Sequence, residues 1–329
     1  MDLGSSDLVI PSIIHDNPGA APTEHQYDSS KSATYQPNGT LIGSQPIGQN
    51  TSGFLSQDDL QLSDLVIKNM LFEEATITEK ESCMFCNQFD TVLPLGPFNA
   101  SNPRNFMSPI AQLISQTLLD ENVFSMLLSR GETDNPGQLV LGGLVDEEFY
   151  EGEFITIPTT NLPTPQPAGT PETWIKGDKW KVEAQSLSLG DGSVIDLQFK
   201  NSTVAVIDTE YPFIIIPASV AHEINKILDA EFWCPFAWVD CKKRSEMPDI
   251  TIVLAGQKFV LTAYDYTFEQ IDSDESGKLY CMSAFGIGYE EDEGLIFLGT
   301  SFLKAWVSVW NLDEMTIGCE YSQMYIENC

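Results

Sequence analysis

The chain has 329 residues, of which 42% are hydrophobic and 10% aromatic, so it is long enough for two domains with separate cores. It carries 48 Asp and Glu against 16 Lys and Arg, a formal charge of −32 at neutral pH. This balance argues against nucleic acid and anionic membranes as partners, because few basic side chains are present to replace the counterions of phosphates. Protonation of carboxylates relieves self-repulsion at this charge, and we hypothesise that the folded chain tolerates acid.

The first informative element is an acidic residue close to the start of the chain. Asp2 lies at the edge of an apolar stretch, and Asp208 lies inside a second one, 206 residues later. A carboxylate in such surroundings costs several kcal/mol unless a partner compensates it. One such residue in each half of the chain predicts that the two halves face each other and share one site.

Short apolar runs, bounded by Gly, Asn, Asp and Pro, recur along the chain and predict a mostly-β protein. Examples are Leu139–Gly143, Gly152–Ile157, Ile250–Leu254 and Gly294–Gly299. Two segments have the apolar spacing of helices instead. We expect one helix over Ser108–Phe124, with Pro109 in its first turn, and a second over Pro217–Phe232.

A proline-rich stretch divides the chain near its middle. Residues 158–172 contain five prolines, which is typical of a linker or an exposed loop. We therefore expect an N-terminal β lobe over 1–157 and a C-terminal β lobe over 173–329. Each half has the same order of acidic motif, strands, one helix and more strands, which indicates a duplication.

The seven cysteines and four Asn-X-Ser/Thr sequons together favour an oxidising, secretory route. The sequons, which are candidate glycosylation sites, begin at Asn38, Asn50, Asn99 and Asn201. Cys83 and Cys86 form a single Cys-X-X-Cys pair, for which we favour a small local disulfide or unpaired thiols over a redox role. Cys234, Cys319 and Cys329 leave an odd thiol that the sequence does not assign.

The termini and the apolar stretches give two further expectations. The chain opens directly on the first acidic motif without a signal peptide, so we expect the natural N-terminus to lie upstream. We expect no membrane span, because Asp208 and Glu210 interrupt the most apolar stretch, Val204–Ala221. Three scattered histidines are too few for a zinc site, and we expect no metal.

The stretch Asp2–Ser12 resembles the first Asp-Thr-Gly-Ser-Ser-Asn-Leu-Trp-Val-Pro-Ser motif of the pepsin-type aspartic endopeptidases, the family that includes cathepsin D. Further resembling stretches follow in the family's order, at Tyr27–Tyr35, Ser52–Asp58, Gln138–Gly143, Asp240–Ile250 and Leu298–Leu303. The resemblance covers nearly the whole chain. It implies an all-β, bilobal pepsin-like fold with a cleft between two pseudo-symmetric lobes.

The resemblance also implies the chemistry of the site. Asp2 and Asp208 would be the catalytic pair, supported by Gly4, Ser5 and Thr209, and would hydrolyse extended peptides or proteins without a cofactor. The family's flap over the substrate would fall on Pro46, Ile47 and Gly48. Cys241 and Cys281 would form a disulfide of the second lobe. The family further implies a monomer in a secreted, lysosomal or vacuolar location.

Several residues depart from the family's pattern around this site. In the two Asp-Thr-Gly triplets, Leu3 replaces the first threonine and Glu210 replaces the second glycine, and Tyr211 replaces the small hydroxyl residue that follows. In the family, a flap tyrosine bonds the tryptophan of the first motif; here Pro46 and Val9 stand at these two positions. Pro94 replaces a further glycine. An endopeptidase with weak or altered activity is therefore one hypothesis. A catalytically inactive homologue that binds peptides or proteins is the alternative, and an incomplete gene product is a third.

Overall fold

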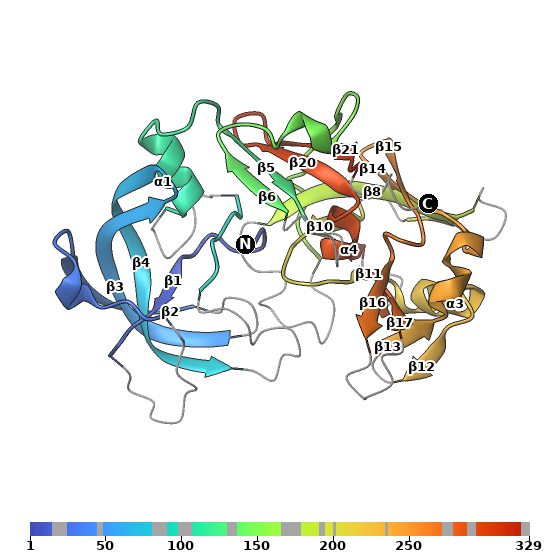
Figure 1. Cartoon of the computed structure of the whole chain (residues 1–329), viewed down its shortest axis with the longest axis horizontal. Coiled ribbons are helices and arrows are strands. Elements are labelled where there is room, and N and C mark those ends of the chain that lie inside the picture. Colours follow the sequence, from blue (N-terminus) through green and yellow to red (C-terminus); the bar gives the residue numbers. More distant parts are fainter. Residues whose placement is uncertain are drawn as a thin grey trace. The chain divides into compact units, whose positions relative to one another are not determined.

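The computed structural model of this chain describes residues 1–14, 25–44, 49–80, 91–97, 107–129, 137–165, 179–190, 195–199, 202–233, 236–271, 279–287 and 294–323. It contains two compact units, Met1–Asp120 with Lys176–Lys179 and Glu121–Ile175 with Trp180–Cys329 (Figure 1). Strands predominate in both units, so the predicted all-β class is confirmed. The predicted lobe boundaries at residues 157 and 173 stay predictions.

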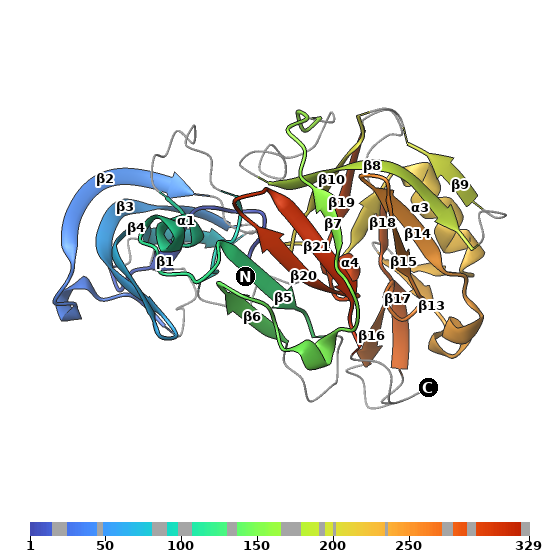
Figure 2. The same ribbon diagram turned by 90° about the horizontal axis from the view of Figure 1, so that it is seen from above.

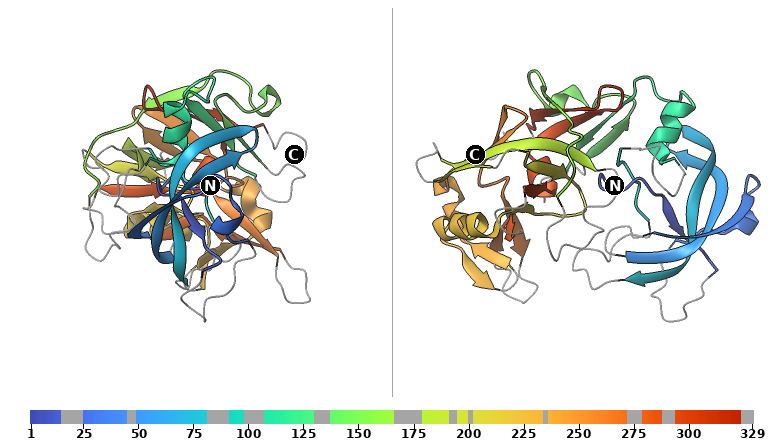
Figure 3. Two further views of the ribbon diagram at one scale, coloured as in Figure 1. Left: turned by 90° about the vertical axis from the view of Figure 1, so that its left-hand side faces the viewer. Right: turned by 180° about the vertical axis from the view of Figure 1, so that it is seen from behind.

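The first unit is built on a curved sheet, which appears in blue from two sides in Figure 3. Among the described residues this sheet has four strands in the order β1–β4–β3–β2, with β1 parallel to β4 and the other pairs antiparallel. The strands are β1 (Val9–Pro11), β2 (Gln36–Ser44), β3 (Gln49–Leu62) and β4 (Leu65–Lys80). Helix α1 (Pro109–Ser115) packs against β4, where Leu113 joins Ile67 and Phe72 in the buried core.

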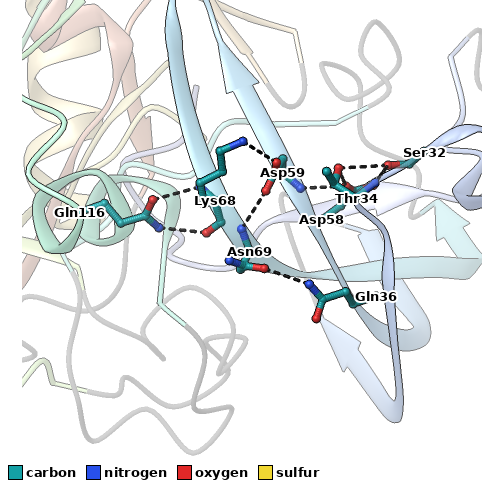
Figure 4. A network of polar contacts seen from close by, with 8 residues as sticks. All are labelled: Ser32, Thr34, Gln36, Asp58, Asp59, Lys68, Asn69 and Gln116. Atoms are coloured by element: carbon teal, nitrogen blue, oxygen red, sulfur yellow. Dashed lines mark hydrogen bonds and ion pairs between the residues drawn. The ribbon is translucent and has the colours of Figure 1, made fainter.

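A chain of polar contacts ties the β3–β4 hairpin to α1 (Figure 4). The Asp59 carboxylate accepts hydrogen bonds from Lys68 Nζ at 2.7 Å and from the Asn69 backbone N–H at 3.1 Å. Gln116, the residue that caps the end of α1, bonds both the N–H and the carbonyl of Lys68, at 3.0 and 2.9 Å. These contacts fix the hairpin against the helix through groups that the sequence motifs do not include.

Asp58, the neighbour of Asp59, is only 6% exposed and is held from several sides. Its carboxylate accepts hydrogen bonds from Tyr27 Oη and Thr34 Oγ1, both at 2.5 Å, and from the backbone N–H of Asp59 at 2.8 Å. Burial acts to raise the pKa of Asp58, but hydrogen bonds from Ser32, Thr34 and Tyr27 outweigh it and hold this pKa below its usual value.

The second unit contains three sheets among the described residues (Figure 2). The largest runs β15 (Gln257–Leu261), β14 (Ile250–Leu254), β8 (Trp180–Leu189), β10 (Val204–Ile207), β19 (Leu295–Leu298), β11 (Ile214–Ile216) and β18 (Phe285–Ile287), with β9 (Ile195–Gln198) paired to β8. The second runs β6 (Gln138–Leu141), β5 (Val123–Leu127), β20 (Trp306–Asn311), β21 (Thr316–Tyr321) and β7 (Ile155–Pro158). The third runs β12 (Glu231–Trp233), β13 (Phe236–Val239), β17 (Leu279–Ser283) and β16 (Thr267–Ile271). Each of the four apolar runs that predicted strands overlaps one of these strands, namely β6, β7, β14 and β19.

Short helices and an aromatic core complete this unit. Helix α3 (Ala218–Ile227) packs against β11 and β18, and the single turn α4 (Thr300–Leu303) follows β19. The 3-10 helices in the two units are Ser29–Lys31, Glu147–Phe149 and Cys241–Glu246. Phe124, Trp180 and Trp310 are each fully buried, and their rings lie 4.9 to 6.2 Å apart. This cluster joins strands β5 and β20 to β8.

Both helices are shorter than their apolar spacing predicts. The first ends at Ser115, and the segment that continues to Phe124 enters strand β5. The second ends at Ile227, and the segment that continues to Phe232 enters β12. The predicted ends were therefore wrong, although both helices exist.

The physical reason is a left-handed residue just beyond each helix. Thr117 has φ 52° and donates its N–H to the Ile114 carbonyl, while Leu118 donates to Leu113. These two bonds form a Schellman motif, which satisfies the last carbonyls and stops the helix. Asp229, with φ 56°, ends the second helix with the same pair of bonds. Glycine usually fills this position, and its absence hid both ends from the sequence pattern.

Replacement of the left-handed residue by glycine should stabilise the first unit. Thr117→Gly removes the strain of a Cβ at positive φ, and we expect the free energy of unfolding to rise by about 1 kcal/mol. Urea denaturation measures it. The control Ser115→Gly places glycine at the last residue of α1, where no positive φ is present to relieve, and should lower this free energy by about 0.5 kcal/mol. Destabilisation by Thr117→Gly would contradict the assigned helix end.

The hydrogen bonds to Asp58 should make the stability of the chain depend on acid pH. Its pKa is lower in the folded state than in the unfolded state, so its contribution is complete above the unfolded value and is lost as pH falls through the folded value. We expect Asp58→Asn to lower the free energy of unfolding by about 2 kcal/mol at pH 6. The difference from the parent chain should shrink below about pH 4. An equal difference at pH 6 and pH 3 would rule out the charged carboxylate as its source.

Candidate active site

Asp2 lies in a tight turn of the first unit, which a second segment of that unit crosses. Its N–H donates to the Leu93 carbonyl at 2.9 Å, and its carbonyl accepts a hydrogen bond from the Leu95 N–H at 2.7 Å. The Ser5 carbonyl accepts a hydrogen bond from the Gly96 N–H at 2.8 Å. The crossing segment therefore holds both ends of the turn through main-chain bonds.

The turn buries the Asp2 carboxylate and supplies it with a donor. Asp2 is 2% exposed, and its Oδ1 accepts a hydrogen bond from the Gly4 N–H at 2.7 Å. A backbone donor at this distance fixes the orientation of the carboxylate. Leu3 points into the core and is fully buried, while Ser5 Oγ accepts the Asp7 N–H at 3.2 Å.

Asp208 follows a fully buried strand of the second unit. Four apolar residues, Val204–Ile207, form β10, which lies between antiparallel β8 and parallel β19 (Figure 2). The Asp208 N–H donates to the Leu298 carbonyl at the end of β19, at 3.2 Å. Asp208 is 1% exposed, and its Oδ1 accepts the Glu210 N–H at 2.9 Å. The central strands of the sheet thus position this carboxylate.

Three consecutive N–H groups at the start of α4 hold the loop that follows Asp208. They belong to Gly299, Thr300 and Ser301 and donate to the carbonyls of Phe213, Tyr211 and Pro212, at 3.0, 2.8 and 3.1 Å respectively. The approach is so close that a Cβ on Gly299 would lie 2.1 Å from the Tyr211 carbonyl oxygen. Gly299 is therefore required for this packing. The sequence showed the residue within a motif, but its role depends on a tertiary contact that no spacing reveals.

The two acidic turns use the same hydrogen-bond scheme. In each, the Asp N–H bonds a leucine carbonyl, and the Asp Oδ1 accepts the N–H two residues further on. The leucine lies 91 residues after Asp2 in the first unit and 90 residues after Asp208 in the second. This match of geometry and spacing is what a duplicated half-site would produce.

Glu210 and Tyr211, which depart from the family's pattern, change the side chains around Asp208 but keep the backbone hydrogen bond to its carboxylate. The family has a glycine at the position of Glu210, as at Gly4 in the first turn. Glu210 nevertheless donates its N–H to the Asp208 carboxylate, and neither Gly4 nor Glu210 has a positive φ. The turn therefore does not need a residue in the left-handed region. Tyr211 packs its ring edge-on against Phe297, with 6.3 Å between the ring centres.

Other predicted site residues lie elsewhere in the chain. The structure contains a disulfide between Cys241 and Cys281, whose Cα atoms are 5.1 Å apart. Asn38 is exposed, and its side-chain oxygen accepts a hydrogen bond from Thr40 Oγ1 at 2.6 Å, while Asn50 lies in β3. The predicted residues outside the described ranges are Pro46, Ile47, Gly48, Cys83, Cys86, Asn99, Asn201, Cys234 and Cys329.

Thr209, which the resemblance counts as supporting Asp208, is half-buried in the second turn. Cys319 carries a free thiol in β21, and burial raises the pKa of this thiol to about 12, so it is unreactive at neutral pH. Within the described ranges, no group of three or more His, Cys, Asp or Glu side chains is arranged to hold a metal ion. None of the helices described has the length and apolarity needed to cross a membrane.

The chain as a whole matches a known family. A family model described as eukaryotic aspartyl protease covers residues 1–321. Vacuolar protease A of Arthroderma otae is 33% identical over 322 residues, which are 97% of this chain and 73% of the relative. The vacuolar aspartic protease of Candida albicans is 32% identical over 97% of this chain and 70% of its own. Cathepsin D of Gallus gallus is 29% identical over 96% of this chain and 75% of its own length.

Paired acidic turns in a mostly-β chain define the class of aspartic proteases, and the matches agree with this. The chain belongs to the eukaryotic aspartyl protease family. The resemblance seen in the sequence motifs is therefore confirmed.

Substitution at Gly299 tests whether the second turn depends on close backbone packing. Gly299→Ala forces a Cβ against the carbonyls of Tyr211 and Phe213, and we expect a loss of about 2 kcal/mol or more in unfolding free energy. The control is Gly143→Ala, whose Cβ would meet only Val140 Cγ1, at 3.7 Å. Chemical denaturation of the two variants should separate them clearly. Equal stability would contradict the packing described.

Proposed function

We propose that this protein is a pepsin-type aspartic endopeptidase in which Asp2 and Asp208 act together on one peptide bond. The observation that carries the proposal is the matched pair of buried carboxylates, each held by the N–H two residues further on. A turn that keeps a carboxylate almost completely buried is costly to build without a function that needs it.

The chemistry follows from placing two such carboxylates in one site. Two carboxyl groups in close contact do not both ionise, so one keeps a proton while the other acts as a base. The base removes a proton from a water molecule, which attacks the scissile carbonyl. The protonated partner donates a hydrogen bond to the developing oxyanion, and a proton then passes to the leaving nitrogen.

The backbone donors give each carboxylate a fixed orientation in this mechanism. Gly4 and Glu210 each bond Oδ1 of their own aspartate, so that rotation of either carboxylate breaks a charge-assisted hydrogen bond. Fixed orientation matters because a displacement of about 1 Å in a reacting group lowers rates about 100-fold. The crossing segments at Leu93 and Leu298 extend this support to the main chain.

We propose a vacuolar or lysosomal compartment and extended peptides or proteins as substrates. Relatives at 32% and 33% identity are named as vacuolar proteases, which supports an acidic site of action. The charge of −32 supports it as well, because acid pH relieves the repulsion between carboxylates. We further propose that the chain works as a monomer.

The alternative is a peptide-binding homologue without hydrolytic activity. Three residues favour it: Leu3 in place of a threonine whose hydroxyl locks the family's two turns, Glu210 in place of a glycine, and Tyr211 in place of a small hydroxyl residue. A third carboxylate beside the pair would change its protonation, and a lost hydroxyl would loosen it. These departures affect the rate of hydrolysis, whereas the backbone geometry of both turns is retained.

The pH dependence of cleavage separates the two functions. The full-length protein should cleave a denatured protein substrate at acid pH, with a rate that falls towards neutrality as the pair loses its shared proton. Asp208→Asn should lower kcat/KM by about 1,000-fold or more, because it leaves no carboxylate base at that position. Identical pH–rate traces for the parent and the variant would contradict the proposal. Binding of peptide without cleavage from pH 2 to 7 would support the inactive homologue.

A further inference from the structure

A run of aromatic side chains begins in the loop after Asp208 and continues over the third sheet of the second unit. The Phe213 ring stacks on Phe236, with 5.9 Å between ring centres and an interplanar angle of 23°. Phe236 meets Trp238 edge-on at 6.4 Å, and Trp238 meets Tyr280 edge-on at 6.0 Å. All four residues are half-buried, so none of them is completely removed from solvent.

The strand register places an acidic residue on the same face of this sheet. Glu231 in β12 lies directly opposite Trp238 in β13, and Trp238 lies opposite Met282 in β17. Residues opposite each other in an antiparallel pair project to the same side, and Tyr280 shares that side with Met282 two residues away. Glu231 is exposed and has no ion pair among the described side chains.

This combination of groups suits a cation. The face of an indole or phenol ring attracts an ammonium or guanidinium group, by about 0.5 to 1 kcal/mol at an exposed site. The second unit already makes such contacts with its own residues. Lys304 Nζ lies 5.0 Å from the centre of the Phe268 ring, and the Arg244 guanidinium lies 5.2 Å from that of Tyr264. A carboxylate beside the ring adds charge attraction, and so does a chain of net charge −32.

We propose that Glu231, Trp238 and Tyr280 form a subsite for a lysine or arginine side chain of a bound peptide. The peptide is the occupant that the structure favours, because the aromatic run is continuous from Trp238 back to Phe213, five residues after Asp208. An extended peptide advances about 3.3 Å per residue, so its basic residue would lie several positions from the bond cleaved. The inference deepens the proposed function, and it rests on that function only for the claim that the bound peptide is a substrate.

Binding to the full-length Asp208→Asn protein tests the subsite without turnover. The probes are fluorescein-labelled 12-residue peptides. Within a series, one position carries Lys, Arg, Gln, Glu or Phe, and this position moves along the peptide from one series to the next. Fluorescence anisotropy gives each Kd. We expect Lys and Arg at one position to bind about 5-fold tighter than Gln, and Glu to bind more weakly. In this background Glu231→Gln and Trp238→Leu should each abolish the preference for Lys and Arg over Gln.

The matched control is Glu223→Gln, which removes one exposed negative charge from α3 and leaves the strands of the third sheet unchanged. This variant should keep the preference for Lys and Arg. The proposal is overturned if the preference survives both Glu231→Gln and Trp238→Leu, if Glu223→Gln reduces it equally, or if the Phe peptide binds tighter than the Lys peptide. If the parent chain prefers Lys and Arg peptides but cleaves none of them, the subsite stands and the proposed function is wrong.

Discussion

The constraint on which the structure depends is the burial of two carboxylates, each of which needs a donor. At 2% and 1% exposure, Asp2 and Asp208 are removed from bulk water, and each accepts a hydrogen bond from the amide two residues ahead. That bond exists only while the turn keeps its shape. The chain keeps it by crossing each turn with a distant segment, through the carbonyls of Leu93 and Leu298. The fold can therefore be understood as support for two tight turns.

This support explains why the backbone of the site tolerates side-chain changes that depart from the family. Glu210 takes the place of a glycine and still donates its N–H at 2.9 Å, because the turn needs an amide and not a left-handed residue. Gly299 is different, since a Cβ there would overlap a carbonyl oxygen at 2.1 Å. The main chain of both turns is thus retained, and under our proposal Leu3, Glu210 and Tyr211 set the strength of catalysis.

Much of this architecture could be predicted from the sequence, and particular residues show where prediction failed. Strand β14 was predicted to the residue, because Ile250–Leu254 is a short run of apolar and β-branched residues between turn residues. The helix ends were missed because Thr117 and Asp229 adopt a conformation usually given to glycine. The role of Gly299 was missed because its neighbour in space, Tyr211, lies 88 residues earlier. The pairing of Glu231 with Trp238 likewise needed the strand register, which the sequence pattern leaves open.

The central proposal is that Asp2 and Asp208 act together on one peptide bond. Calorimetric titration of the full-length protein with a statine-type inhibitor at acid pH tests it most directly, because binding does not depend on the rate of cleavage. The account predicts one inhibitor per chain and a loss of at least about 100-fold in affinity for both Asp2→Asn and Asp208→Asn. Unchanged affinity in either folded variant would contradict it.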